Sequence, residues 1–288
     1  MNIFNLATNK VPEHLREIIQ SIQEVLGQEG YEFLLIGATA RDLILDGINN
    51  LGVGRKTLDV DFAIYVPEWG SYEALIHKLL NSGKFAATKV KHRLLYKQLY
   101  EVDIVPFGAI QNEKGEYAWP PDFMMAMNVA GFIEINKNGV EIQTDEDLKF
   151  KIAPIEGICV MKLFAWKDRK QRIDKDGRDL GFILSNYVEL KYEVLYEQYA
   201  DIIESDNWDT ITSGARILGR DMANVIIGNE YALHHLKNIL TEELSDEDNS
   251  RLAKVMCDGQ SFNYQKSVKA LAEILKGLTD YRTNLPGK

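Results

Sequence analysis

The stretch YEFLLIGATARD, residues 31–42, decides our expectation for the fold. Its first half is an apolar, β-prone run, which predicts a buried strand over residues 31–36. The run ends at a turn of small residues that begins with Gly37, and the apolar residues 43–45 then favour a helix. A strand that leads through a tight turn into a helix is typical of a sheet domain with helices on its faces.

The next β-prone run, LDVDFAIYV at residues 58–66, carries two acidic residues. Alternation along a strand puts Asp59 and Asp61 on one face, roughly 6.5–7 Å apart at the backbone, so their carboxylates can converge on one cation. Carboxylate oxygens are hard ligands that suit Mg²⁺. A strand whose polar face simply meets solvent shows the same pattern, so the two aspartates alone leave both interpretations open.

A third aspartate, Asp103, lies in another β-prone segment, residues 94–106, between apolar neighbours. An unpaired carboxylate in a buried strand is costly, which indicates that Asp103 has a partner. If its strand neighbours the strand of Asp59 and Asp61, the three carboxylates could hold two Mg²⁺ ions about 3.5–4 Å apart. Such a cluster suits the in-line transfer of a phosphoryl or nucleotidyl group.

The turn formed by Gly37, Ala38 and Thr39 is a candidate phosphate site. Glycine lets a ligand approach the backbone closely, and backbone N–H groups at the start of a helix favour phosphate. Most turns of this kind only connect a strand to a helix. The position of this one just ahead of the aspartate strand favours the phosphate interpretation.

The pattern along the rest of the chain predicts two domains. Residues 1–155 have the expected element order α-β-α-β-α-β-β, which indicates an α/β or α+β mixed sheet domain. From residue 156 to 288 helical periodicity replaces the strand pattern and predicts an all-α bundle. The helices expected in the two halves cover residues 13–27, 71–82, 158–167, 179–187, 192–203, 209–227, 231–240, 248–256 and 264–278.

Composition excludes several classes of protein. The chain has 288 residues, of which 45% are hydrophobic and 26% charged, as in ordinary globular proteins. A net charge of −10 argues against broad non-specific nucleic-acid binding, although a local basic surface could hold an RNA end or a triphosphate.

No apolar run approaches the ~20 residues of a membrane-spanning helix, and no signal-peptide pattern is present, so we expect a cytoplasmic protein with no membrane partner. Neither a disulfide nor a zinc site is indicated, because the chain has only two cysteines, Cys159 and Cys257, far apart.

The pattern Gly37-Ala38, then Asp59-x-Asp61, then Asp103 resembles the DNA polymerase β-type nucleotidyltransferase superfamily. The resemblance covers roughly the first 110 residues. It implies that the turn binds the triphosphate and that Asp59, Asp61 and Asp103 are catalytic and bind Mg²⁺, with Asp103 also helping to activate the acceptor hydroxyl. Ala38 stands where glycine or serine is usual, and Arg41-Asp42 is similar to the same turn in tRNA CCA-adding enzymes.

A second segment is similar to the AbiEii-type nucleotidyltransferases, the toxins of bacterial type IV toxin–antitoxin systems. It comprises Lys162, Arg169, Lys175, Asp176 and Asp179, in a stretch of seven basic and four acidic residues, net +3. The resemblance implies that Lys162 contacts the nucleotide and that Asp179 has a catalytic or supporting role. The nucleotide-binding residues expected from both resemblances are then Gly37, Ala38, Thr39, Arg41, Lys162 and Asp179.

The sequence therefore predicts a nucleotidyltransferase that depends on two Mg²⁺ ions and transfers NMP from a nucleoside triphosphate to an acceptor hydroxyl. An RNA 3′ end, such as that of tRNA, is the expected acceptor, and the toxin resemblance implies a separate antitoxin protein as partner. A small hydroxylated acceptor of the aminoglycoside type is an alternative, because the acidic chain would attract a cationic substrate. A catalytically idle nucleotide-binding protein is the alternative from another class.

Overall fold

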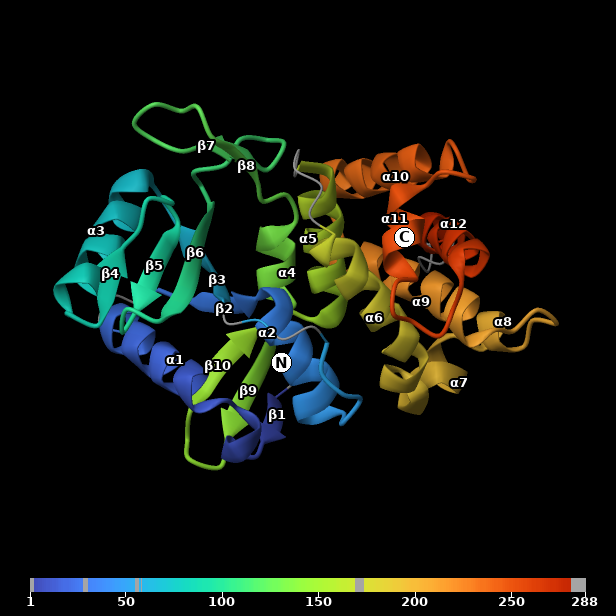
Figure 1. The fold of residues 1–288 in the computed structure, drawn as a ribbon, viewed down its shortest axis with the longest axis horizontal. Helices are drawn as coiled ribbons and strands as arrows, with labels where there is room; N and C mark the ends of the chain where they lie inside the picture. Colours follow the sequence, from blue (N-terminus) through green and yellow to red (C-terminus); the bar gives the residue numbers. More distant parts are fainter. Residues whose placement is uncertain (1–2, 28–30, 55–56, 58, 169–173, 281–288) are drawn as a thin grey trace. The chain divides into compact units, whose positions relative to one another are not determined.

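The structure of the chain, a computed structural model, describes residues 3–27, 31–54, 57, 59–168 and 174–280 (Figure 1). It divides into two compact units, Met1–Pro154 and Ile155–Lys288. The first unit contains all the described strands, and the second unit is helical. None of the helices in the described ranges is both long and apolar enough to span a bilayer.

The first unit is built on a mixed eight-stranded sheet with the strand order β1-β9-β10-β2-β3-β6-β5-β4. The pairs β1·β9, β10·β2 and β3·β6 are parallel, and the other pairs are antiparallel. Two further strands form a separate ribbon. The strands are β1 (Ile3–Leu6), β2 (Phe33–Ile36), β3 (Val60–Val66), β4 (Phe85–Ala87), β5 (Arg93–Tyr96), β6 (Tyr100–Gly108), β9 (Val140–Thr144) and β10 (Lys149–Ile152), with the ribbon β7 (Glu116–Ala118) and β8 (Ala126–Asn128).

Helix α1 (Glu13–Leu26) covers one face of this sheet beside α3 (Trp69–Asn81) (Figure 1). Its apolar stripe of Leu15, Ile18 and Ile22 is buried, as the periodicity of residues 13–27 predicted. The remaining helical elements of the unit are η1 (Thr8–Lys10), α2 (Gly37–Asp42), the π-helix η2 (Leu43–Ile48) and α4 (Phe132–Lys137).

The face of the sheet opposite α1 carries the acidic residues. His14 of α1 stacks on Tyr100 of β6 at 4.6 Å between ring centroids, so Tyr100 points toward the helix. Successive strand residues point to opposite faces, and Asp103, three positions further, therefore points the other way. Asp61 of β3 is the register partner of Asp103 and shares its face.

The second unit is assembled from helices. The α9 and α12 helices cross closely, because Gly219 and Gly277 face each other and a Cβ added at Gly277 would lie 2.9 Å from the Cα of Gly219. The predicted helix over residues 192–203 is broken into three short elements. The elements of this unit are α5 (Ile155–Asp168), α6 (Lys175–Leu190), η3 (Tyr192–Val194), α7 (Leu195–Gln198), α8 (Ala200–Ile203), α9 (Thr210–Val225), α10 (Glu230–Leu244), α11 (Arg251–Met256) and α12 (Tyr264–Asp280).

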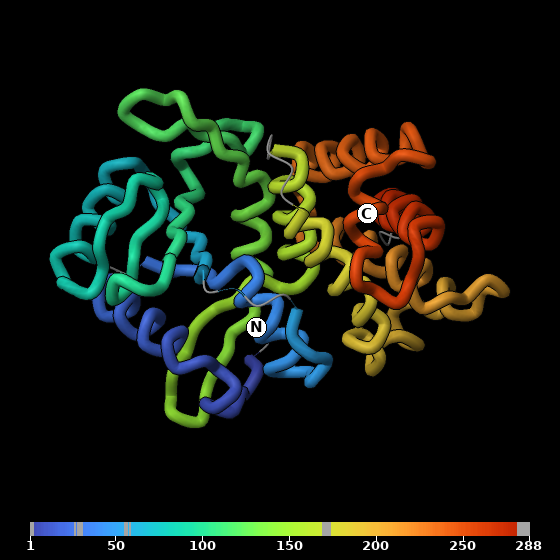
Figure 2. The backbone as a smooth tube through the Cα atoms, viewed as in Figure 1, coloured from blue at the N-terminus to red at the C-terminus, as the bar shows by residue number. Residues whose placement is uncertain are grey.

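Several observed elements of the sheet unit differ from the predicted ones. Strands β1 and β7 to β10 were not predicted, and three predicted segments have a different structure or different bounds. Residues 94–106 form part of a hairpin, β5 and β6, and not one strand (Figure 2). Residues 37–42 are helical from Gly37 onward, so the turn occupies that single residue. Asp59 precedes β3, which begins at Val60, and Leu58 lies outside the described residues.

Candidate functional site

The register of three neighbouring strands, β2, β3 and β6, places expected site residues of the sheet unit next to one another. Ile36, the last residue of β2, pairs with Asp61 of β3, and Asp61 pairs with Asp103 of β6. The β3·β6 pair is parallel, so both carboxylates leave the same face of adjacent strands. Asp61 is half-buried and Asp103 is only 7% exposed. Two acidic side chains are thus held side by side at the point where β2 ends.

Gly37 lies directly against the Asp61 carboxylate. Its φ of +73° is a backbone conformation that glycine adopts without strain, and it lets β2 turn at once into α2. A Cβ at this position would come within 2.2 Å of Oδ2 of Asp61. Only a residue without a side chain fits between the turn and this carboxylate.

Ala38 and Thr39, which the sequence assigned to the turn, belong to α2 and have different surroundings. Ala38 is 6% exposed, so its methyl group belongs to the core. The Oγ1 of Thr39 donates a hydrogen bond of 3.3 Å to the backbone carbonyl of Asp59. Thr39 therefore ties the turn to the segment that leads into β3, and Asp59 itself is half-buried there.

Asp103 is paired with Arg93, a residue that the sequence did not single out. Arg93 stands opposite Asp103 in the β5·β6 ladder. Its Nε and Nη2 donate to Oδ1 and Oδ2 of Asp103 at 2.7 and 2.8 Å, and its Nη1 donates to Oε2 of Glu101. These hydrogen bonds, first of all those to Asp103, raise the pKa of the Arg93 guanidinium. A guanidinium fork thus occupies both oxygens of the third aspartate.

Two further groups border Asp103. His92 has Nε2 3.9 Å from Oδ2 of Asp103, and burial lowers the pKa of its imidazole, which favours the neutral ring. Within the described residues, Nδ1 of His92 is buried without a hydrogen-bond partner. Burial, and secondly the negative charge of Asp103, raises the pKa of Tyr72, whose hydroxyl donates to the carbonyl of Ile104 at 2.9 Å. Asp103 is therefore buried beside the Arg93 guanidinium and the His92 imidazole.

Arg41 does not extend from the turn as a nucleotide-binding residue would. Its side chain is fully buried, and its Nη2 and Nε lie 2.7 and 2.8 Å from Oδ1 of Asp42. The same carboxylate oxygen accepts the backbone N–H of Gly54 at 3.2 Å. A Cβ at Gly54 would meet the guanidinium at 2.5 Å. We therefore assign Arg41 to holding the loop before β3, because a buried guanidinium is not open to a ligand.

Lys162 and Asp179 belong to an ion cluster inside the helical unit. Nζ of Lys162, on α5, lies 2.6 Å from Oδ2 of Asp179 and 3.2 Å from Oδ1 of Asp176, both on α6. The side chains of the three residues are 11%, 2% and 1% exposed. The lysine charge is thus compensated by two buried carboxylates. Arg169, which completes the expected signature, lies outside the described residues.

The residues of the sheet unit fit Mg²⁺ in the chemistry of their donors. Asp61 and Asp103 offer hard oxygens on one face, and the backbone of Gly37 lies directly against the Asp61 carboxylate. Across the described ranges, no three His, Cys, Asp or Glu side chains are grouped as metal ligands. The cationic guanidinium of Arg93 holds Asp103, so a metal ion at that carboxylate would have to take its place.

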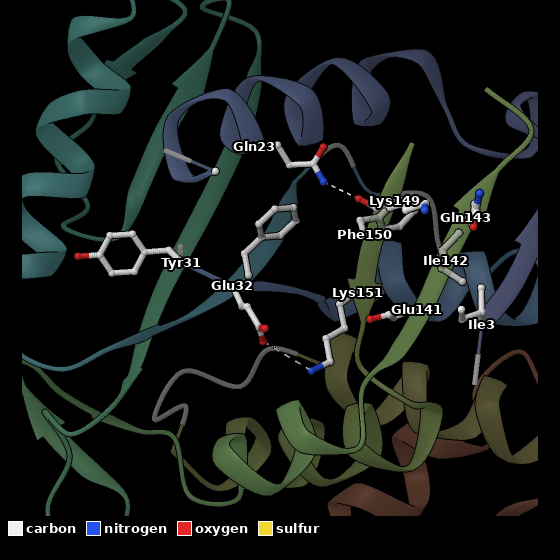
Figure 3. A pocket seen from close by; sticks show the side chains of 12 residues that line it. Ile3, Gln23, Tyr31, Glu32, Glu141, Ile142, Gln143, Lys149, Phe150 and Lys151 are labelled. Carbon is white, nitrogen blue, oxygen red and sulfur yellow. Dashed lines mark hydrogen bonds and ion pairs between the residues drawn. The ribbon is translucent and has the colours of Figure 1, made fainter. Parts of the chain in front are cut away.

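A pocket of about 480 Å³ lies elsewhere in the sheet unit, between the end of α1 and strands β2, β9 and β10 (Figure 3). Phe33 and Phe150 contribute apolar surface, and Glu32 and Lys151 approach each other at 4.0 Å at its rim. None of the expected catalytic or nucleotide-binding residues lines it. The pocket and the paired aspartates are therefore separate features of the same sheet.

Comparisons with known proteins give little support for any assignment. No protein-family model matches the chain, and no curated protein matches it either. A nucleotidyltransferase from H. pylori, whose assignment is itself provisional, has a solved structure that aligns at a TM-score of 0.34 and 13% identity. The alignment covers 94% of this chain and 97% of that one. A likeness this slight establishes neither the fold nor the activity of this chain.

Proposed function

We propose that this chain is a Mg²⁺-dependent nucleotidyltransferase that transfers NMP from a nucleoside triphosphate to an acceptor hydroxyl. The observation that carries the proposal is the position of Gly37, directly after β2, against Asp61 of β3, which pairs with Asp103 of β6. A tight glycine turn beside two carboxylates combines backbone donors for phosphate with ligands for a divalent cation.

The residues would divide the work as follows. Asp61 and Asp103 would hold Mg²⁺, which neutralises charge on the α-phosphate and the leaving pyrophosphate when it is bound. The backbone around Gly37 would face the triphosphate, and Asp59 would add a further carboxylate at the start of β3. Asp103, the more deeply buried of the two carboxylates, would polarise the acceptor hydroxyl.

We further propose an RNA 3′ end, such as that of tRNA, as acceptor, with a role as the toxin of a toxin–antitoxin pair. Only the two sequence resemblances support this finer assignment. Lys162 and Asp179 we assign first to the fold of the helical unit, because they pair with each other in its interior. A contact of Lys162 with the triphosphate would appear as a raised KM for the nucleotide in a folded Lys162 variant.

One observation favours a second candidate function, a nucleotide-binding protein without transfer activity. In the structure both oxygens of Asp103 accept hydrogen bonds from Arg93. In a catalytically inactive protein Arg93 would never release this carboxylate. Such a protein would bind nucleotide at the glycine turn and leave it unreacted.

Incubation with α-labelled nucleoside triphosphates, Mg²⁺ and total RNA separates these functions. Transfer predicts label on RNA, and a small-molecule acceptor predicts label on a soluble product when candidate acceptors such as aminoglycosides are supplied. The idle protein predicts retention of intact nucleotide with no label transferred. An Asp61→Asn variant measured in parallel identifies label that comes from a contaminating enzyme.

A further inference from the structure

Arg93 has two carboxylate partners that lie on one strand. Glu101 and Asp103 are two residues apart on β6 and therefore point to the same face of the sheet, where the Arg93 side chain lies across them. The Asp103 side chain is 10% exposed, whereas that of Glu101 is 47% exposed and that of Arg93 26%. The guanidinium thus spans a buried carboxylate and a solvated one.

The two hydrogen bonds from the Arg93 guanidinium occupy lone pairs of the Asp103 oxygens that a metal ion would need. Both Asp103 oxygens accept from Arg93 at 2.7 and 2.8 Å, and arginine carries its charge at every pH at which a protein folds. Metal and guanidinium therefore compete for Asp103. Glu101 offers Arg93 a second position within the same hydrogen-bonded group, so the arginine can release Asp103 and keep a partner.

We propose that Arg93 is the resident counter-ion of Asp103 and that its shift onto Glu101 admits a divalent cation to the carboxylate pair. The proposal rests on the proposed function, since it takes Asp103 to be a metal ligand. Arg93 is then a positioning residue that sets how readily the site accepts metal. In the absence of metal it also spares the sheet a buried, uncompensated carboxylate.

The test is the affinity of the full chain for Mn²⁺ alone, measured by titration calorimetry or by the electron paramagnetic resonance signal of free Mn²⁺. Arg93→Gln removes the competitor, and we expect it to bind Mn²⁺ about tenfold more tightly than the wild type, which corresponds to ~1.4 kcal/mol. Arg93→Lys keeps the charge but loses the fork, and its affinity should lie between the two. Arg178→Gln removes one arginine from an exposed pair with Asp258 and should leave the affinity unchanged.

A double-mutant cycle with Glu101→Gln tests the shift itself. Without the second carboxylate, Arg93 should stay on Asp103, so Glu101→Gln should weaken Mn²⁺ binding several-fold in the wild-type background. In the Arg93→Gln background the same change should have little effect, because no guanidinium remains to be redirected. A simple loss of negative field near the metal would weaken binding equally in both backgrounds and would overturn the proposal.

Asp61→Asn keeps the failure of this proposal distinct from failure of the proposed function. If Asp61→Asn loses Mn²⁺ binding while Arg93→Gln binds no more tightly than the wild type, Arg93 does not compete with metal and only the further proposal falls. If Asp61→Asn binds Mn²⁺ as the wild type does, or no protein binds it, the metal site itself is wrong and both fall. Circular dichroism of each variant excludes misfolding as the cause of lost binding.

Discussion

Each unit contains a cluster in which a cation lies between two carboxylates, and these two clusters differ in their exposure to solvent. In the sheet unit, Arg93 joins Asp103 to Glu101. In the helical unit, Lys162 joins Asp176 to Asp179, with side chains between 1% and 11% exposed, against 10% to 47% in the first cluster. Each of the two clusters has one positive and two negative side chains, but of the two only the sheet cluster is open to solvent on one side.

This difference separates a site that can exchange its cation from one that cannot. Removing a partner from a fully buried ion cluster leaves charges without water or counter-ion, which costs several kcal/mol and ties the cluster to the fold. A half-exposed cluster loses less, since water replaces the missing partner. We therefore expect changes in the sheet cluster to alter binding and activity, and changes in the helical cluster to alter stability.

The largest effect we expect is the loss of transfer in Asp61→Asn. The loss of one metal ligand should lower kcat/KM by about 100-fold or more, because each ~1.4 kcal/mol of lost transition-state stabilisation is tenfold in rate. Incorporation of label from an α-labelled nucleotide measures the loss. The midpoint of thermal unfolding should change little, since the side chain is half-buried and keeps its size.

Asp258→Asn is the control for this first prediction, because it removes an exposed carboxylate of the helical unit that pairs with Arg178. It should leave both activity and stability near those of the wild type. Comparable turnover in Asp61→Asn and Asp258→Asn would mean that Asp61 is not part of the active site. The expectation that changes in the sheet cluster alter activity would then be wrong.

The converse prediction concerns Lys162→Met. The substitution keeps much of the volume but leaves Asp176 and Asp179 buried without the lysine, so the free energy of unfolding should fall by about 3–5 kcal/mol. Urea denaturation followed by circular dichroism measures it. Lys84→Met breaks the exposed pair with Glu24, whose side chains are 42% and 66% exposed, and should cost at most about 1 kcal/mol. Equal costs for the two variants would mean that burial of the ion pair does not determine how much stability is lost with its lysine.

Gly37→Ala tests, within the sheet unit, whether the position of the Asp61 carboxylate controls activity. At a φ of +73° any side chain is strained, and here the new Cβ would also displace the Asp61 carboxylate, 2.2 Å away. We expect a loss of about 1–2 kcal/mol in stability, from strain at one such position, together with a marked fall in transfer activity. Gly52→Ala is the matched control, since Gly52 has a φ of +87° with nothing within 4 Å of its Cβ position. An equal loss of activity in both variants would show that strain alone, and not the position of Asp61, is responsible.

Sequence patterns located the aspartates but not the group that holds one of them. Alternation within β3 and the apolar surroundings of Asp103 were sufficient to predict two strands, and the structure pairs Asp61 with Asp103. Asp59 could not be placed, because periodicity does not show that β3 begins one residue later. Strands β1 and β7 to β10 were missed. Strands β9 and β10 are short with mixed polar sequences, and each has one partner far away in the chain.

Arg93 was missed because the turn between β5 and β6 has no sequence signal. The two central residues, Lys97 and Gln98, have φ values of +49° and +57°, a pair of conformations that hairpins normally build with Asn-Gly or Asp-Gly. Without that signal the segment looks like one long strand, in which Arg93 and Asp103 would lie far apart. The hairpin instead folds Arg93 back onto Asp103.

The smallest effect we expect follows from this turn. Gln98→Gly replaces a side chain at positive φ by the residue that adopts it without strain, and should stabilise the protein by about 0.5–1 kcal/mol. Leu99→Gly is the control, because Leu99 is also exposed, at 64%, but has no positive φ, so glycine there adds only unfolded-state entropy and should destabilise. Urea denaturation compares the two.

Since a firmer turn holds Arg93 opposite Asp103 without touching either residue, Gln98→Gly should leave the Mn²⁺ affinity within about twofold of the wild type. A change in affinity as large as that of Arg93→Gln would mean that the hairpin as a whole, and not the exchange of Arg93 between Asp103 and Glu101, controls the site.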